Sequence, residues 1–305
     1  MNNQYREVKE YMKKVVITTL LIIALVLNLT ACSSKTSETS KPSVYASFYP
    51  IYDLTSKIGG DKVTVKNIIP FNVSPHGWEP TAREIAEITK AKAVLYLGLT
   101  LDDPWINKIM VSAPHAEFYE VSKGIEPITK GNTINPHVWI SPKEALIVAK
   151  NINEALQKID PNNKNYFEKN YQKLKTELEN LDKQYTEELS KTRLKTFVVF
   201  HSAFAYVARD YELNQESLVG MSDEAEPSPA RMSELVALIK KEKIKYIFAE
   251  NLSAAKPMET IAQESGATVL KLNTIGTLTQ EDVKKKADFM SLMKDNLENL
   301  KKGLE

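Results

Sequence analysis

The stretch PNNKNYFEKNYQKLKTELENLDKQYTEELS, residues 161–190, contains no turn signal, and it decides how the rest of the chain can be organised. Its apolar residues recur every three or four positions, the spacing that places side chains on one face of an α-helix. A helix of this length makes roughly eight turns. The apolar positions are Phe167, Tyr171, Leu174, Leu178, Leu181, Tyr185 and Leu189. The pattern predicts either a coiled-coil segment or a rigid rod between two folded lobes.

Short β-rich runs alternate with amphipathic helical stretches on both sides of this segment. The runs cover residues 44–48, 63–69, 93–97 and 118–121 before it, and 196–200, 244–249 and 268–272 after it. Strands that alternate with helices are typical of parallel sheets covered on both faces. The central position of the long helix therefore favours the rod. We predict an α/β fold with an N-terminal lobe over 44–160, a connecting helix over 161–190 and a C-terminal lobe over 191–305.

Several helix starts can be read directly. Thr81 with Glu84, and Ser141 with Glu144, have the spacing of a capping box, in which the two side chains bond the backbone N–H groups of the first turn. Ser228 precedes a proline, which suits the first position of a helix. We expect helices to begin at these three points.

The amino terminus has the features of a secretory signal. Lys13 and Lys14 precede an apolar run over 15–27, and LTAC follows at 29–32. Thirteen helical residues reach about 20 Å, less than the roughly 30 Å of a hydrocarbon core. LTAC resembles a bacterial lipobox, which implies a signal peptide over 1–31, with Met12 as an alternative start, and lipidation of Cys32. The small polar residues that follow predict a flexible tether over 32–43.

Charge and cysteine content exclude some classes of partner and ligand. A chain that begins at Cys32 loses four of its 40 basic and two of its 39 acidic residues, which leaves a formal charge of −1. This balance gives no electrostatic footprint for nucleic acid. Cys32 is the single cysteine, so a lipidated chain has no thiolate to offer a metal. Any metal site must use imidazole and oxygen ligands.

Three of the four histidines share a local pattern. His76 and His137 both lie in the sequence P-H-x-W, each just ahead of a predicted helix, and His201 follows a predicted strand. A single loop histidine is more often an ordinary hydrogen-bonded residue, but two matching loops favour a shared role. Helix amino termini disfavour imidazolium, and neutral imidazole binds Zn, Cu, Fe and Ni. His115 lacks the pattern and is interpreted as a surface residue.

These motifs resemble those of the metal-binding lipoproteins of bacterial ABC importers, the ZnuA/TroA-like cluster A-I solute-binding proteins. The matching segments are PHGWEPT at 75–81, NPHVWISP at 135–142, FHSAFAY at 200–206, EPSP at 226–229 and IFAE at 247–250. The resemblance covers roughly residues 44–304. It implies two α/β lobes joined by one long helix, with a metal ion in the cleft between them.

The resemblance also implies a ligand set. His76 and His137 match the two ligands of the first lobe, and His201 matches a third that is typical of zinc-binding members. The fourth family position carries Asp or Glu, and the matching residue here is Asn273. Asn offers only a neutral carbonyl oxygen, so three histidines with water or a weak Asn273 contact would complete a tetrahedral ion.

We therefore expect a monomeric, lipid-anchored, extracytoplasmic protein that captures a divalent metal and delivers it to an ABC permease. Zinc is favoured, and manganese or iron are alternatives within the same family. Lobe movement that separates His201 from the other two histidines would release the ion. A zinc hydrolase with an open three-histidine site is the alternative from another class, with Glu250, Asp223, Glu224 or Glu226 as its base. A surface adhesin that binds metal incidentally is a third. We favour a binding protein over an enzyme.

Overall fold

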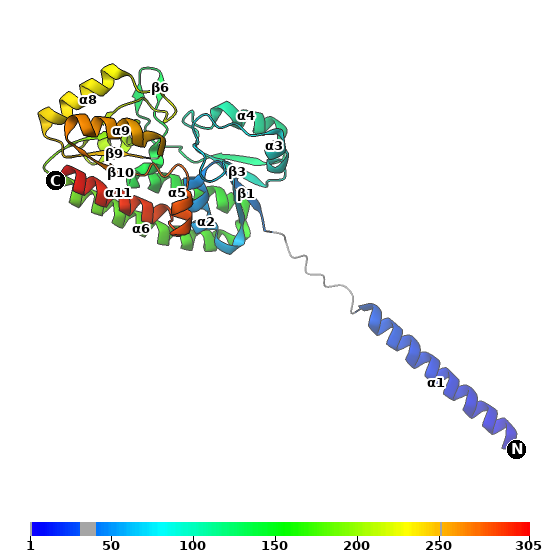
Figure 1. The fold of residues 1–305 in the computed structure, drawn as a ribbon. Helices are drawn as coiled ribbons and strands as arrows, with labels where there is room; N and C mark the ends of the chain where they lie inside the picture. The colour runs from blue at the N-terminus through cyan, green and yellow to red at the C-terminus, as the bar shows by residue number, and fades with distance from the viewer. Residues whose placement is uncertain (1, 31–40, 251) are drawn as a thin grey trace. The chain divides into compact units, whose positions relative to one another are not determined.

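The computed structural model describes residues 2–30, 41–250 and 252–305 (Figure 1). The chain divides into two compact units, Met1–Ser40 and Lys41–Glu305. The first contains helix α1 (Asn2–Thr30). Among the described residues, no helix has both the length and the apolar character needed to cross a membrane. The predicted lipidation site, Cys32, lies outside the described residues, as does the predicted tether up to residue 40.

The N-terminal lobe contains a four-stranded sheet in which every neighbouring pair is parallel, in the order β2-β1-β3-β4. Its strands are β1 (Ser43–Ala46), β2 (Thr64–Asn67), β3 (Ala93–Tyr96) and β4 (Glu117–Glu120). Its helices are α2 (Tyr49–Gly59), η1 (Gly60–Lys62), α3 (Ala82–Ile88), α4 (Asp103–Ser112), η2 (Val138–Ile140) and α5 (Pro142–Ile159). A short antiparallel pair, β5 (Thr129–Lys130) and β6 (Thr133–Ile134), precedes η2.

The C-terminal lobe contains two parallel pairs, β7 with β8 and β9 with β10, and β7 lies beside β9. Its strands are β7 (Thr196–Val199), β8 (Asn214–Ser217), β9 (Tyr246–Ala249) and β10 (Thr268–Lys271). Its helices are α7 (Ala205–Asp210), α8 (Pro229–Glu242), α9 (Leu252–Ser265), α10 (Gln280–Lys284) and α11 (Phe289–Leu304). The prediction missed β8, whose four residues are polar and lack the β-branched pattern of the other strands.

The long helix is α6 (Lys164–Ser190), which follows the short helix η3 (Pro161–Asn163). All seven residues of the predicted stripe are buried. Figure 1 shows α6 passing along α2 and α5 at one end and α11 at the other, and these contacts belong to one continuous apolar core. The predicted fold class, α/β with parallel sheets and one long helix between the lobes, is confirmed. The predicted lobe boundaries stay predictions.

The predicted helix starts differ in outcome. Thr81 and Glu84 form the capping box, and the Ser228 hydroxyl accepts a bond from the backbone N–H of Arg231. The capping box predicted at Ser141 is wrong. The Ser141 hydroxyl donates to Asp210 of α7, and Glu144 binds Arg209 of the same helix. These side chains bind residues of α7 instead of closing the first turn of α5.

Candidate metal centre

The structure brings His76, His137 and His201 together, although they are about sixty residues apart in the sequence. His76 lies in the loop between β2 and α3, His137 precedes η2, and His201 follows the carboxyl end of β7. The Nε2 atom of His137 lies 3.0 Å from Nε2 of His76 and 3.2 Å from Nε2 of His201. The three candidate ligand atoms all lie within 4.8 Å of one another. Both lobes therefore contribute to one cluster.

Hydrogen bonds on the far side of two rings determine which nitrogen carries the proton. The side-chain oxygen of Asn135 lies 2.9 Å from Nδ1 of His137 and also accepts the backbone N–H of that residue. The carboxylate of Glu250 accepts the backbone N–H of His201 at 3.0 Å with one oxygen and binds His201 Nδ1 with the other. Because both partners are acceptors, both Nδ1 atoms must donate. The Nε2 lone pairs of His137 and His201 are thus directed at each other.

Burial favours the neutral form of the His137 and His76 rings. It lowers the pKa of His137 well below its ordinary value, and the neighbouring rings of His201 and His76 lower it further. Burial also lowers the pKa of His76 to about 4, with His201 acting in the same direction and the carboxylate of Asp223 opposing it. A neutral ring whose proton lies on Nδ1, as for His137, has a free Nε2 lone pair, which is the form that coordinates metals.

The geometry fits a tetrahedral transition-metal ion. An ion bound at 2.0–2.1 Å to each of two nitrogens holds them about 3.3 Å apart. The observed separations of 3.0 and 3.2 Å are close to this value. Two Nε2 lone pairs at such a distance repel each other unless a cation lies between them. The residues present therefore suit a cation bound by three imidazoles.

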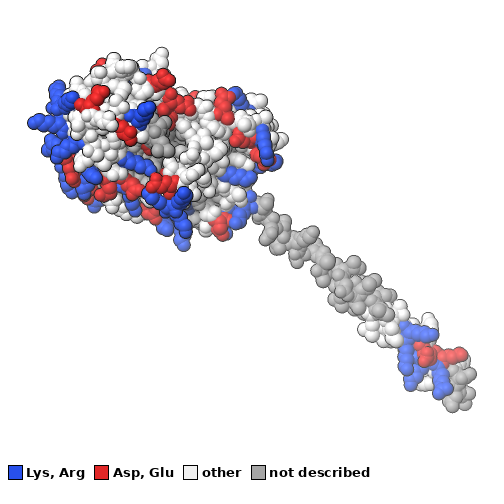
Figure 2. Space-filling view, in the orientation of Figure 1, with Lys and Arg blue, Asp and Glu red and all other residues white. Residues whose placement is uncertain are grey.

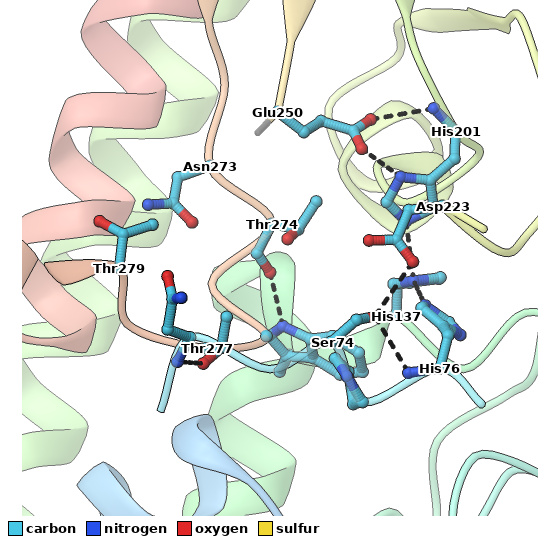
Figure 3. A pocket seen from close by; sticks show the side chains of 14 residues that line it. Ser74, His76, His137, His201, Asp223, Glu250, Asn273, Thr274, Thr277 and Thr279 are labelled. Carbon is cyan, nitrogen blue, oxygen red and sulfur yellow. Dashed lines mark hydrogen bonds and ion pairs between the residues drawn. The ribbon is translucent and has the colours of Figure 1, made fainter. Parts of the chain in front are cut away.

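The cluster lines a cavity of about 140 Å³ between the lobes, shown in Figure 3. Asn273 and Thr274 line another part of it, and Asp223 and Glu250 reach it from the C-terminal lobe. The structure does not place Asn273 in the cluster. Its side-chain oxygen accepts the backbone N–H of Ile275 at 2.8 Å, and its own backbone is bonded to the side chain of Asn296. The Asn273 side chain thus stabilises a turn.

The two P-H-x-W tryptophans have different roles. Trp139 donates from its indole nitrogen to the backbone oxygen of Thr274 at 2.8 Å, and its ring packs against that of His137. It ties the His137 loop to the other side of the cavity. Trp78 instead packs edge-on against Trp105. His115 is exposed and lies outside the cluster.

Sequence reasoning missed two residues that orient the rings. Asn135 was part of a quoted motif, and its position two residues before His137 is the spacing at which an Asn side chain bonds nearby backbone. Glu250 was predicted as the end of the IFAE motif and as a possible base, but not as a partner of His201. It directly follows β9, which lies beside β7, so the neighbouring strand ends could have indicated its contact with His201.

Two α/β lobes with a buried three-histidine cluster between them indicate a metal-binding protein of the two-lobed type. Comparison with known protein families identifies the family within this class. Residues 44–303 match the model of the family described as "Zinc-uptake complex component A periplasmic". The chain belongs to this family.

Relatives and solved structures agree with this membership. The chain is 34% identical to the high-affinity zinc uptake system protein ZnuA of Bacillus subtilis (strain 168), covering 95% of this chain and 96% of that protein. It is 34% identical to the zinc-binding lipoprotein AdcA of Streptococcus pneumoniae (strain R6), again over 95% of this chain, but it spans only 61% of AdcA. The Zn(II)-bound ZnuA-like domain of S. pneumoniae AdcA superimposes with a TM-score of 0.78 at 33% identity, covering 87% of this chain and 99% of that domain.

Proposed function

We propose that this protein captures zinc between its lobes with His76, His137 and His201 and delivers it to an importer. The observation that carries the proposal is the convergence of three Nε2 atoms, separated by 3.0 and 3.2 Å, with Asn135 and Glu250 bonded to the Nδ1 atoms of two of the rings. Such a cluster directs three ring nitrogens at one point where a cation can bind. The relatives named as zinc uptake and zinc-binding proteins support the same cargo.

The ligand type favours zinc over manganese. Manganese prefers carboxylate, carbonyl and water oxygens, whereas imidazole suits zinc. Among the described residues, the cluster of candidate ligands is made of three histidines and no carboxylate. Zinc also accepts four-coordinate tetrahedral geometry, which three close nitrogens and one further ligand provide.

Binding is favoured over hydrolysis because the leading candidate base is already engaged. Glu250 is 5% exposed, and its two oxygens accept the backbone N–H and the ring N–H of His201. Glu224 and Glu226 are exposed. The cavity of about 140 Å³ suits an ion with water better than an organic substrate.

The partner and location follow from the same proposal. A permease of an ABC importer would receive the ion, as expected for a relative of a zinc uptake system. Anchoring through a lipidated Cys32 would keep the monomeric protein on the outer face of the cell membrane. On the face that Figure 2 shows, basic and acidic side chains are interspersed over residues 41–305, in keeping with the near-balance of charge.

The contacts around the rings indicate where the ion leaves. His137 and His201 are 1% and 2% exposed, and Asn135 joins their loops by donating to the backbone oxygen of Ser202 at 2.7 Å. His76 is only half-buried. Release by lobe movement would have to break the Asn135 bond and the contacts of Asp210 and Arg209 with α5. We infer that the exit path lies on the His76 side.

The test combines metal analysis with two histidine variants. Elemental analysis of protein purified from its native host should find about one zinc per chain. Calorimetry should show that His137→Ala lowers zinc affinity by at least about 100-fold, since one of three ligands is lost, while the exposed control His115→Ala leaves it unchanged. Manganese in the native protein, or wild-type zinc affinity in His137→Ala, would contradict the proposal.

A further inference from the structure

The three histidines leave a tetrahedral ion one ligand short. The family position for that ligand holds Asn273, whose side-chain oxygen already accepts the backbone N–H of Ile275 at 2.8 Å. Figure 3 shows Asn273 across the cavity from the histidine rings. One lone pair of the Asn273 oxygen is thus already engaged, and a residue that lies nearer the rings is a better source of the missing ligand.

Asp223 approaches the cluster from the C-terminal lobe. It lies in the loop between β8 and α8, and Figure 3 shows its carboxylate beside the histidine rings. The Ser74 hydroxyl donates to Oδ1 of Asp223 at 3.0 Å and accepts the backbone N–H of His76 at 3.2 Å. One hydroxyl thus connects the carboxylate to the residue that carries the half-buried ring.

The neighbouring residue fixes the same loop against the His76 loop. The Glu224 carboxylate packs on Gly77, where an added Cβ would lie 2.5 Å from Glu224 Oε2. Gly77 also has a φ of +70°, which side chains other than glycine rarely adopt. Glycine at this position allows the loop around residues 222–224 to lie directly over the loop around residues 74–77. The contact between the two loops places the Asp223 carboxylate beside the histidine rings (Figure 3).

We propose that Asp223 coordinates the zinc ion as its fourth ligand and so supplies the carboxylate that position 273 lacks. The inference rests on the proposed zinc-binding function. The carboxylate keeps its bond from Ser74 at Oδ1, and Oδ2 leaves its other contacts in the ion-free protein to bind the ion. Among the described residues, Asp223 is not part of the close three-histidine cluster, so the loop moves toward the rings when the ion binds.

This ligand has a consequence for the charge of the bound site. Three histidines bring no negative charge into direct contact with the ion, and the Glu250 carboxylate acts only through the His201 ring, whereas an Asp223 carboxylate would touch the ion and cancel one of its charges. The carboxylate comes from a loop that is held to the His76 loop by the Ser74 bond and the Gly77 contact. Opening this pair of loops therefore removes His76 and Asp223 together, on the side already inferred for exit.

The experiment compares Asp223→Asn with Glu224→Gln in the full chain. Asn keeps an oxygen for the Ser74 bond but has no charge, and Glu224→Gln makes the same change one residue away. Zinc affinity is measured by calorimetry, and the ligand geometry by the visible absorption of the cobalt(II)-substituted protein, which is more intense for four-coordinate tetrahedral than for higher-coordinate sites. We expect Asp223→Asn to lower zinc affinity by about 10- to 100-fold and to alter the cobalt spectrum, and Glu224→Gln to change neither.

The outcomes separate this inference from the function on which it rests. Wild-type affinity and an unaltered cobalt spectrum in Asp223→Asn would overturn the ligand assignment and leave the three-histidine site intact. Lower affinity with an unaltered spectrum would also overturn it, because the carboxylate would then act only through its charge. A wild-type protein that binds no zinc would overturn the proposed function itself.

Discussion

The side-chain oxygen of Asn135 lies 2.9 Å from Nδ1 of His137, and it therefore fixes both the orientation and the tautomer of that ring. The amide nitrogen of the same side chain donates to the backbone oxygen of Ser202, next to His201. A single asparagine thus orients one candidate ligand and joins its loop to the loop of another.

Replacing Asn135 should weaken zinc binding without touching a ligand. Asn135→Ala removes the partner of His137 Nδ1 and the bridge to Ser202, and loss of such outer contacts typically costs 10- to 100-fold in metal affinity. Calorimetry with zinc measures the effect. Asn170→Ala, which removes a similar bond to the backbone oxygen of Ile58, is the control and should keep wild-type affinity. Equal affinity in the two variants would show that Asn135 does not support the site.

Glu250→Gln should act on His201 in a different way. The carboxylate accepts two N–H groups, but an amide has only one oxygen, so its NH₂ group would face either the backbone N–H or the ring. If the NH₂ group faced the ring, Nδ1 of His201 would have to accept a hydrogen bond, and the ring proton would move to Nε2. We expect zinc affinity to fall by about 10- to 100-fold. The exposed control Glu264→Gln should bind like wild type, and an unimpaired Glu250→Gln would refute the tautomer argument.

The buried stripe of α6 predicts a stability effect far from the site. Leu178 is fully buried, so Leu178→Ala should lower the free energy of unfolding by about 3–5 kcal/mol through lost burial and a residual cavity. Glu177, one position earlier, is exposed, and Glu177→Ala should change stability by less than about 0.5 kcal/mol. Urea denaturation of both variants checks the difference. Similar losses in the two would contradict the packing of α6.

Asp102 predicts a pH dependence of stability. Its carboxyl accepts the backbone N–H groups of Leu97 and Gly98, but burial dominates and raises its pKa to about 7 from an ordinary value of 3.8. Between pH 3.8 and about 7, the carboxyl group is therefore protonated in the folded chain and ionised in the unfolded chain. The resulting stabilisation is complete below pH 3.8 and is lost as the pH rises through 7.

The variant Asp102→Asn should remove this dependence. Its side-chain oxygen can still accept the backbone bonds, and no charge is buried at high pH. Between pH 4 and pH 7.5, the free energy of unfolding of the variant should rise relative to that of wild type by on the order of 2–4 kcal/mol. The size follows because one pKa unit corresponds to about 1.4 kcal/mol. Urea denaturation at the two pH values measures it. A difference between variant and wild type that does not change with pH would disprove the raised pKa.

The sequence predicted those features that depend on local periodicity. The stripe from Phe167 to Leu189 and the strand ends near His201 follow from side-chain spacing and β-propensity. Features that depend on residues far away in the chain could not be predicted from the sequence. Ser141 and Glu144 have the spacing of a capping box, but Asp210 and Arg209, nearly seventy residues later, compete for their side chains. The polar strand β8 has no pattern of its own and forms only because β7 offers it a parallel edge.

In the candidate site, too, local sequence patterns were predictive and contacts between distant residues were not. The P-H-x-W pattern and the strand before His201 were sufficient to select three histidines. The bond of Asn273 to Ile275 is local and has the same spacing as that of Asn135 to His137, but its contact with Asn296 was not predictable, because it depends on how the turn after β10 meets α11. Similarly, Asp223 lies in an irregular loop, and only the fold places it near Ser74.

The apolar core that α6 shares with both lobes has a thermodynamic consequence. Because the buried side chains of α5, α6 and α11 belong to one continuous core, the lobes should melt together in a single cooperative transition. An ion held in the cleft then stabilises the entire folded unit by linkage, by about 4 kcal/mol when free zinc exceeds its dissociation constant 1,000-fold. The melting temperature of the whole protein thereby becomes a gauge of how much zinc its surroundings contain.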